Sequence, residues 1–369
     1  MNRRSTTLSW LAAVLLACAG LASIALAQDN PYPNARPIFL AGSHPENAPP
    51  AGSPQLTQWN GTFTYQGVKY PFIMVGTDPS KTNTSTTVPV FLVPIKMVYG
   101  PSNGNKTFDP VKHKLPDGET VLHNILTSPI LSAGIDFKQG GVDLGNTQYI
   151  DAFQRGNFWG NNVKKNHNYQ VLLGKPTVLP EQTIKVSPSL GSVITNPISG
   201  KGLVGTYDFQ TLDNMINQVY FKKFKQIHPN ALPIFFTYDI YLTSGGCCIG
   251  GYHFNNGPAP GAQTYSFFTT VDQGPNEFSQ DVSAFSHEIG EWVDNPFYPN
   301  NAVLCGELEV GDPLENNPNF GGFPYKLHGF TYNLQDLVFL PYFGAPKSTS
   351  LKGWFTFQNF PFTVCQNGG

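Results

Sequence analysis

The stretch SHEIGEW, at residues 286–292, is the most informative in the chain because it contains the pattern H-E-x-x-E. On an α-helix, residues four positions apart project from the same face. His287 and Glu291 can therefore both reach one divalent cation, while Glu288 lies beside them, placed to hold a water molecule. This is the spacing of the zinc-peptidase helix, with glutamate in place of the second histidine.

Carboxylates are concentrated around this stretch. Five of the nine glutamates fall between positions 288 and 315, in a chain of which only 12% of the residues are charged. Clustered carboxylates repel one another, and a cation is the simplest counter-charge. A catalytic zinc takes three protein ligands and leaves one position for water. Among the downstream acids Glu307, Glu309 and Asp312, the last two are the preferred pair, one as third ligand and the other as a partner of His287. Their order stays open.

The expected occupant of this site is one Zn²⁺ ion. Carboxylates also suit calcium, but a histidine ligand favours zinc or another transition metal. One histidine and two carboxylates nearly neutralise Zn²⁺, so the metal polarises a water less, and Glu288 as general base would offset part of that loss. His253, His328 and Tyr332 are candidate donors for polarising a substrate carbonyl. The alternative is a solvated helix face that binds no metal.

The order of predicted elements around this stretch suggests a fold class. A helix is expected over Tyr207–Ile227, strands over Leu232–Leu242 and Thr264–Val271, and a helix from Asn276 or Ser279 to Asp294. This order predicts an α+β fold with a zincin-like core, made of a mixed sheet, a backing helix and the active-site helix. The strand Thr264–Val271 is expected to line the cleft and pair with an extended substrate.

The rest of the chain divides by composition. Residues 28–57, rich in Pro, Asn and Ala, predict an extended arm rather than a core element. Residues 58–204 predict a β-rich N-terminal portion, with strands near 62–65, 69–75 and 88–98 and a helix around Thr147–Trp159. Residues 205–369 form the predicted metal-binding portion, either separate from 58–204 or continuous with it.

The first 27 residues predict a signal peptide. Arg3 and Arg4 precede an almost wholly apolar run that ends in ALA at residues 25–27, which favours cleavage after Ala27 and a secreted, periplasmic or cell-envelope protein. The remaining 342 residues would carry 20 basic and 24 acidic side chains. They contain no basic patch for nucleic acid and no further long apolar run for a membrane span. The oligomeric state stays open.

Four cysteines follow the predicted cleavage point: Cys247, Cys248, Cys305 and Cys365. An even number in an exported chain favours two disulfides. Because adjacent cysteines do not easily bond to each other, Cys247 and Cys248 are each expected to pair with a distant partner. A zinc site made of all four thiolates lacks the usual spacing.

The run from Ser286 through Asn295-Pro296, followed by EVGD at residues 309–312, resembles the H-E-x-x-E…[ND]-P…E-[IV]-G-D pattern of bacterial secreted zincin-like proteins. It is similar, more distantly, to the plant EXORDIUM / phosphate-induced protein family, whose Cys-x-Tyr/Trp-His element resembles Cys248…Tyr252-His253 with extra residues inserted. The resemblance covers residues 232–343. It implies an extracellular protein with a zincin-like core, and the plant members look like growth-signalling wall proteins.

Two functions remain in competition. The first is a secreted zinc-dependent metallohydrolase, a peptidase acting on a peptide or protein substrate, in which Glu288 activates a water at the metal. The second is a non-catalytic extracellular or cell-wall-associated binding protein of EXORDIUM-like type, with a structural or vestigial metal site. Aromatic clusters such as Trp354–Phe362 would then be candidates for binding carbohydrate, or simply for core packing.

Overall fold

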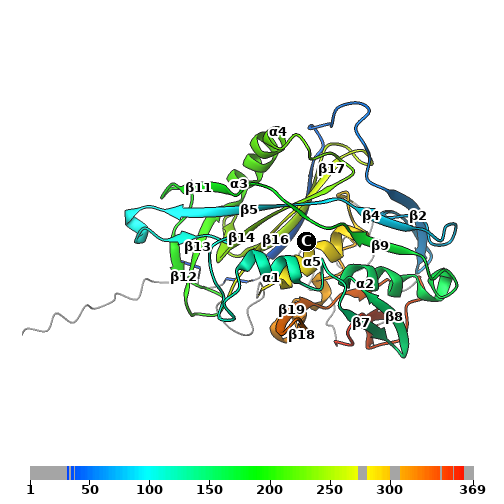
Figure 1. The fold of residues 1–369 in the computed structure, drawn as a ribbon. Helices are drawn as coiled ribbons and strands as arrows, with labels where there is room; N and C mark the ends of the chain where they lie inside the picture. Colours follow the sequence, from blue (N-terminus) through cyan, green and yellow to red (C-terminus); the bar gives the residue numbers. More distant parts are fainter. Residues whose placement is uncertain are drawn as a thin grey trace, which may run out of the picture.

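The computed structural model describes residues 31–32, 35–36, 38–272, 281–299, 308–340, 343–351 and 353–360. The predicted signal peptide, Cys305 and Cys365 lie outside these ranges. Within them the protein is a strand-rich α+β fold built on a curled mixed sheet (Figure 1). No helix among the described residues is long and apolar enough to cross a membrane.

The centre of the sheet is formed by strands that follow one another in the order β5, β14, β17, β16. β5 (Val90–Tyr99), β14 (Leu232–Tyr238) and β17 (Gln263–Thr270) are parallel, and β16 (Ile249–Asn256) is antiparallel to β17. β14 and β17 are buried on both faces, as expected for strands covered by helices on each side. Because β5 pairs with β14, the sheet joins the range 58–204 to the range 205–369.

Shorter strands extend the sheet on both sides. β10 (Thr177–Val178) and β11 (Gln182–Val186) pair in parallel with β5, and β6 (Thr107–Phe108) pairs with it antiparallel. Beyond β16 come β15 (Ile240–Thr243), β13 (Leu203–Asp208) and β12 (Val193–Thr195). The single strand predicted over Leu232–Leu242 is therefore two strands. Asp239 has φ 51° and interrupts the extended run between β14 and β15.

Helices cover the two faces of this sheet, with α3 and α4 on one side and α5 on the other (Figure 1). The predicted helix over Tyr207–Ile227 is realised as α3 (Phe209–Met215), a π-helical turn over Ile216–Tyr220 and α4 (Phe221–Lys223). Asp208 caps it by accepting a hydrogen bond from Thr211 N. α5 spans Ser283–Asp294 and ends at the predicted residue. The expected cap residues Asn276 and Ser279 lie outside the described ranges.

The remaining elements surround α5 and the sheet. α1 (Val121–Thr127) and α2 (Tyr149–Asn157) lie on the α5 side, and α2 confirms the helix predicted around Thr147–Trp159. Four separate two-stranded pairs are β2 (Gln58–Tyr65) with β3 (Val68–Val75), β4 (Ser85–Val88) with β9 (Gln170–Leu173), β7 (Ile135–Gln139) with β8 (Val142–Thr147), and β18 (Gly322–Leu327) with β19 (Phe330–Gln335). A small sheet contains β20 (Val338–Phe339), β21 (Ser350–Leu351) and β22 (Trp354–Thr356).

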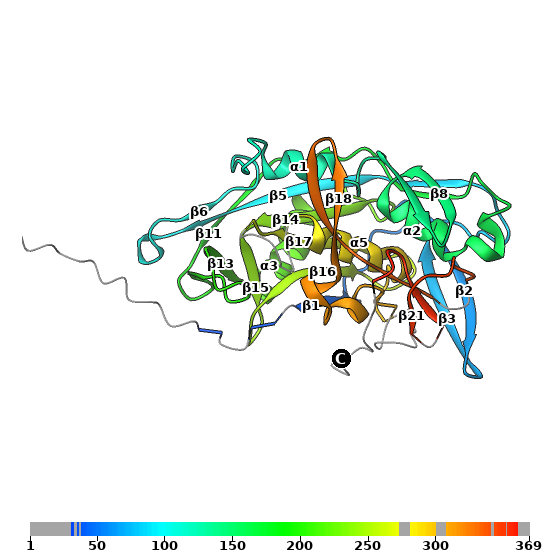
Figure 2. The same ribbon diagram turned by 90° about the horizontal axis from the view of Figure 1, so that it is seen from below.

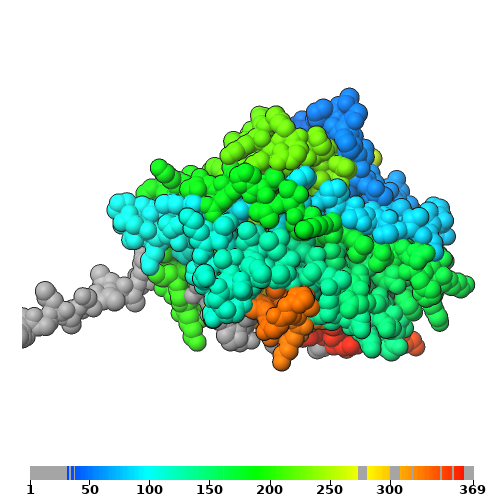
Figure 3. Space-filling model, in the orientation of Figure 1, coloured from blue at the N-terminus to red at the C-terminus, as the bar shows by residue number. Residues whose placement is uncertain are grey.

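The hairpin β18–β19, drawn in orange, projects beside α1 at the lower edge of the space-filling view (Figure 3). Its Tyr332 hydroxyl lies 2.9 Å from the hydroxyl of Thr127 at the end of α1. Tyr332, one of the candidate carbonyl donors, is therefore engaged with α1. Trp354 and Phe357 are buried in the core, so these members of the C-terminal aromatic cluster serve packing and not carbohydrate binding.

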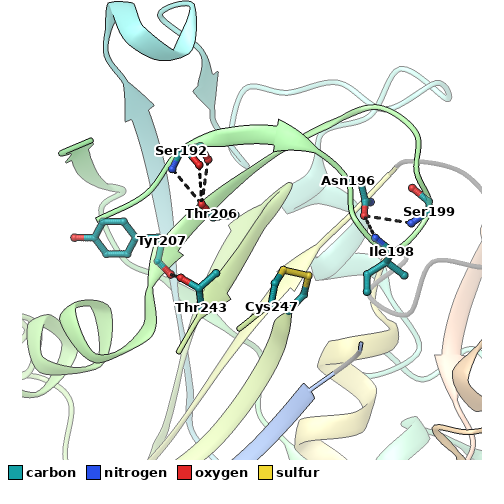
Figure 4. Close-up of a disulfide and its surroundings, with 9 residues drawn as sticks. Ser192, Asn196, Ile198, Ser199, Thr206, Tyr207, Thr243 and Cys247 are labelled. Atoms are coloured by element: carbon teal, nitrogen blue, oxygen red, sulfur yellow. Dashed lines mark hydrogen bonds between the residues drawn. A yellow bond between two sulfur atoms is a disulfide. The ribbon is translucent and has the colours of Figure 1, made fainter. Parts of the chain in front are cut away.

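The structure corrects two predictions, the extended arm over residues 28–57 and the distant disulfide partners of Cys247 and Cys248. Residues 38–44 are not an arm outside the fold, because they form β1 (Ile38–His44), which pairs in parallel with β16. Cys247 and Cys248 form a disulfide with each other, at the start of β16 (Figure 4). The disulfide packs in a small apolar cluster with Ile194, Val204, Tyr241 and Val271, between strands that the sequence did not place together.

Candidate metal centre

The side chains of His287 and Glu291 meet on one face of α5, as their four-residue spacing predicts. Nε2 of His287 lies 3.0 Å from Oε1 of Glu291. Asp312, at the start of a short 3₁₀ turn over Asp312–Leu314, brings Oδ1 to 3.5 Å from the same nitrogen. The backbone N–H of Gly311 donates to Oε1 of Glu291 at 3.1 Å, which fixes the loop against the helix. These contacts unite three of the predicted site residues.

The donor atoms of this group fit a divalent metal. Zinc bonds to nitrogen and oxygen of about 2.0–2.2 Å, arranged tetrahedrally, place two ligand atoms roughly 3.3 Å apart. The separations of 3.0 and 3.5 Å around Nε2 of His287 bracket that value. The imidazole of His287 is fully buried, and within the described part of the chain neither of its nitrogens has a hydrogen-bond partner. An unpaired buried nitrogen next to two carboxylates is the arrangement expected of a metal ligand.

Glu309, the other acid preferred from the sequence, lies by a different histidine. Its Oε1 accepts a hydrogen bond from the Asn295 side chain at 2.5 Å and stands 4.0 Å from Nε2 of His253. His253, Glu291 and Glu309 form a second group whose ligand atoms lie within 4.8 Å of one another. The sequence left open whether Glu309 is the third ligand or the partner of His287. The partner role is not found, because Glu309 lies by His253 and Asn295. Asp312 is the carboxylate nearest to His287 after Glu291.

The ring of His253 is held on both sides. Nε2 lies 3.1 Å from the backbone carbonyl of Asn295, and because a carbonyl only accepts, this nitrogen carries the hydrogen. Nδ1 is then the acceptor, and it lies 3.2 Å from Oε2 of Glu288. Burial, followed by the proximity of His287, lowers the pKa of His253 to about 3, so the ring is neutral. The geometry therefore makes His253 the partner of Glu288 and not a free metal ligand through Nε2.

Glu288 is fully buried, and its carboxyl group points towards β16. Its Oε1 has no hydrogen-bond partner among the described residues. A Cβ atom at Gly251 of β16 would lie only 2.6 Å from that oxygen, so the space that Glu288 occupies depends on a residue without a side chain.

Burial changes the acidity of the whole cluster. It raises the pKa of Glu288, Glu291 and Glu309, and in each case a neighbouring carboxylate raises the pKa further. Burial and then Asp312 raise the pKa of Glu315 to about 8. Without a cation these groups hold protons, because a buried negative charge is costly and like charges repel. A divalent cation would supply the missing positive charge and displace those protons.

Phe39, in β1, covers the centre. Its ring stacks on the imidazole of His287, with ring centroids 3.7 Å apart and planes at 20°. His287, Glu288 and Glu291 are at most 1% exposed, whereas the Asp312 side chain is 33% exposed and forms the solvent-facing edge of the group. No local pattern pointed to Phe39, since its contact with His287 depends on the pairing of two strands more than two hundred residues apart.

The strand predicted to pair with a substrate does not have a free edge. β17, which corresponds to Thr264–Val271, lies between β14 and β16 and is paired on both sides. β16 lies beside α5, and β1 pairs with it from Ile249 to Asn256. Ile249 also pairs with Leu242 of β15. The third candidate donor, His328, stands in the turn between β18 and β19 with φ 52°. The prediction that β17 pairs with a substrate is wrong, because both of its edges are occupied by other strands.

Comparisons with known proteins return no match for this chain, whether among family models, curated proteins or solved structures.

Proposed function

We propose that the protein is a secreted zinc-dependent hydrolase of peptide bonds with a zincin-like core. The observation that carries the proposal is the convergence of His287, Glu291 and Asp312 within ligand distance beside the buried Glu288. In this interpretation α5 is the active-site helix, the mixed sheet lies against it, and α3 with α4 forms the backing layer. Export is inferred from the apolar N-terminal segment alone.

His287, Glu291 and Asp312 would hold Zn²⁺, which when bound supplies a Lewis acid for a water and a substrate carbonyl. Glu288 would take the proton of the attacking water and pass it to the leaving nitrogen. Once Glu288 has taken that proton, its Oε2 would donate it in a hydrogen bond to Nδ1 of His253, the acceptor nitrogen that the Asn295 carbonyl fixes. Glu309 would hold the side chains of Asn295 and Glu291 in place through hydrogen bonds.

The test is zinc content followed by proteolysis. Purified protein is expected to contain one zinc ion per chain and to cleave denatured casein in a reaction that a chelator stops. Glu288→Gln is expected to keep its zinc and to lose about 10²–10⁴-fold in rate, the usual contribution of a general base. Full activity of Glu288→Gln would remove its role as base, and absence of zinc would remove the metal assignment.

A second function is favoured by one observation, the burial of His287, Glu288 and Glu291. A closed centre of this kind suits a structural metal in a non-catalytic extracellular or wall-associated binding protein. That function predicts bound zinc, no cleavage of casein under any condition, and loss of thermal stability when the metal is removed. The same two measurements therefore separate the two functions.

A further inference from the structure

β1 pairs with β16 along its full length, and β16 packs against α5 (Figure 2). The pairing is parallel and runs from Ile38 opposite Ile249 to His44 opposite Asn256. At its start, the backbone around Arg36 and Ile38 is hydrogen-bonded to Cys247 and Cys248. Without β1, the stretch of β16 from residue 251 to 256 would expose its N–H and C=O groups as a free sheet edge.

The two faces of β1 make different contacts, because side chains alternate along a strand. Phe39 points to the α5 side and stacks on His287, and Ala41 stands opposite His253. On the other side Gly42 faces the ring of Phe254, where a Cβ atom would lie 2.5 Å from the nearest ring carbon.

His44 continues the face of Gly42. Its Nε2 lies 2.6 Å from Oδ2 of Asp213 in α3, and this hydrogen bond raises the pKa of His44. Asp213 is buried and also accepts a hydrogen bond from the Tyr265 hydroxyl at 2.7 Å. The end of β1 is thus anchored to a polar group that the core holds in place.

From these contacts we infer that β1 occupies the peptide-binding edge of the candidate metal centre and acts as an intramolecular strap. The inference rests on the proposed function. A peptide bond cannot approach the fully buried imidazole of His287 while the ring of Phe39 stacks on it, and Glu288 next to it on α5 is buried as well. Release of β1 exposes the edge of β16 and the face of His287 together, since one strand covers both.

The contacts of β1 also define the peptide that replaces it. Such a peptide binds as an extended strand through its backbone, as in other β-augmentation complexes. It carries a flat aromatic side chain at the position of Phe39, over the imidazole. It carries a small residue at the position of Gly42, because Phe254 leaves no room there. At the position of His44 it carries a hydrogen-bond donor or a cationic group, which pairs with the carboxylate of Asp213.

The strap is tested by the accessibility of His287 in metal-free protein, using diethyl pyrocarbonate and peptide mass spectrometry. Gly42→Leu forces β1 away from Phe254 on the face opposite the metal centre, and Gly100→Leu is the control because a Cβ atom there meets nothing within 4 Å. We expect His287 to react at least about tenfold faster in Gly42→Leu than in the wild-type chain, since overpacking shifts the local equilibrium towards the open strand. Equal rates in both variants would overturn the strap.

A second measurement avoids the risk that Gly42→Leu fails to fold. A specific protease site inserted at Ala51-Gly52, in the exposed segment after β1, allows the strap to be cut without changing it. A labelled peptide of residues 38–44 should then bind to the cut protein and not to the intact one, and a version with Phe39 replaced by alanine should bind at least about tenfold more weakly. Binding of both peptides to intact protein would contradict the strap.

The activity of the cut protein separates the two proposals. Peptide binding together with increased casein cleavage supports both the strap and the hydrolase. Peptide binding without cleavage upholds the strap and removes the hydrolase. Cleavage at the same rate before and after cutting, with no peptide bound, upholds the hydrolase and removes the strap.

Discussion

Nε2 of His287 and Oδ1 of Asp312 lie 3.5 Å apart, although one belongs to the middle of α5 and the other to a turn that follows a long connection. The spacing of residues along the helix does not account for this contact, because Asp312 lies outside α5. Glu291 alone could not hold a metal with His287, because a stable site takes at least three ligands from the protein. The metal centre therefore depends on tertiary structure as much as on the H-E-x-x-E pattern.

Loss of the histidine ligand should remove zinc. We expect His287→Ala to lower zinc affinity by more than about 100-fold, because even partners of ligands contribute 10–100-fold. His123→Ala is the matched control, since that ring is half exposed on α1 and beside a single carboxylate, Glu119. Affinity is measured by competition with a chromophoric chelator. Equal affinities for the two variants would show that zinc binds elsewhere.

The two downstream acids should differ in their effect on zinc. Asp312→Asn removes a direct ligand and is expected to weaken zinc binding by more than about 100-fold. Glu309→Gln removes a group that holds Asn295 and Glu291, so a loss of about 10–100-fold is expected. The same chelator competition measures both. If the order is reversed, Glu309 is the ligand and the metal lies closer to His253.

Crowding the general base should slow hydrolysis without releasing zinc. In Gly251→Ala the new methyl group would lie 2.6 Å from Oε1 of Glu288, so the carboxyl must move. Gly246→Ala is the control, because a Cβ atom there has nothing within 4 Å. We expect a fall in kcat of at least about tenfold for Gly251→Ala, with unchanged zinc content and unchanged cleavage by the control. An unaffected rate in Gly251→Ala would argue against Glu288 as base.

The stability of the metal-free protein should fall as the pH rises. Glu288, Glu291, Glu309 and Glu315 have raised pKa values in the folded chain, the last at about 8, so the folded state binds more protons than the unfolded state above their ordinary value of 4.5. Under this condition the free energy of unfolding decreases as the pH rises, by about 1.4 kcal/mol per pH unit for each proton that only the folded state holds.

For Glu315 the window runs from about pH 4.5 to about pH 8, and the raised pKa values of the other three glutamates act in the same direction. Thermal unfolding of chelated protein is expected to give a lower Tm at pH 8 than at pH 5. Zinc should raise the Tm more at pH 8, because it binds the deprotonated carboxylates and displaces their protons. A Tm of the chelated protein that rises between pH 5 and pH 8 would contradict a buried, protonated cluster.

Local patterns in the chain were sufficient for the main elements. The sequence predicted a helix that ends at Asp294, and α5 ends there and is buried along its whole length. The strands predicted over Leu232–Leu242 and Thr264–Val271 correspond to β14 with β15 and to β17. These features depend on neighbours within a few positions, so they can be derived from the order of residues.

The prediction about the cysteines was wrong because it considered each cysteine by local geometry alone. The structure closes the bond between Cys247 and Cys248 where the chain enters β16, and packs it under Tyr241 and Val271. The strand expected to pair with a substrate was Thr264–Val271, which corresponds to β17. Strand order is set by long-range pairing, which inserted β16 and β1 on its outer side.

The order of residues by itself determined the helix that carries His287, Glu288 and Glu291, since the four-residue spacing fixes one face of a helix wherever it is placed. Only the folded chain selected Asp312 over Glu309 as the neighbour of His287, brought His253 to Glu288, and laid Phe39 across the imidazole. Those three contacts join segments far apart in the chain. They depend on the register of β1 on β16, on the packing of β16 against α5 and on the position of Asp312 beside α5, and no local pattern encodes these.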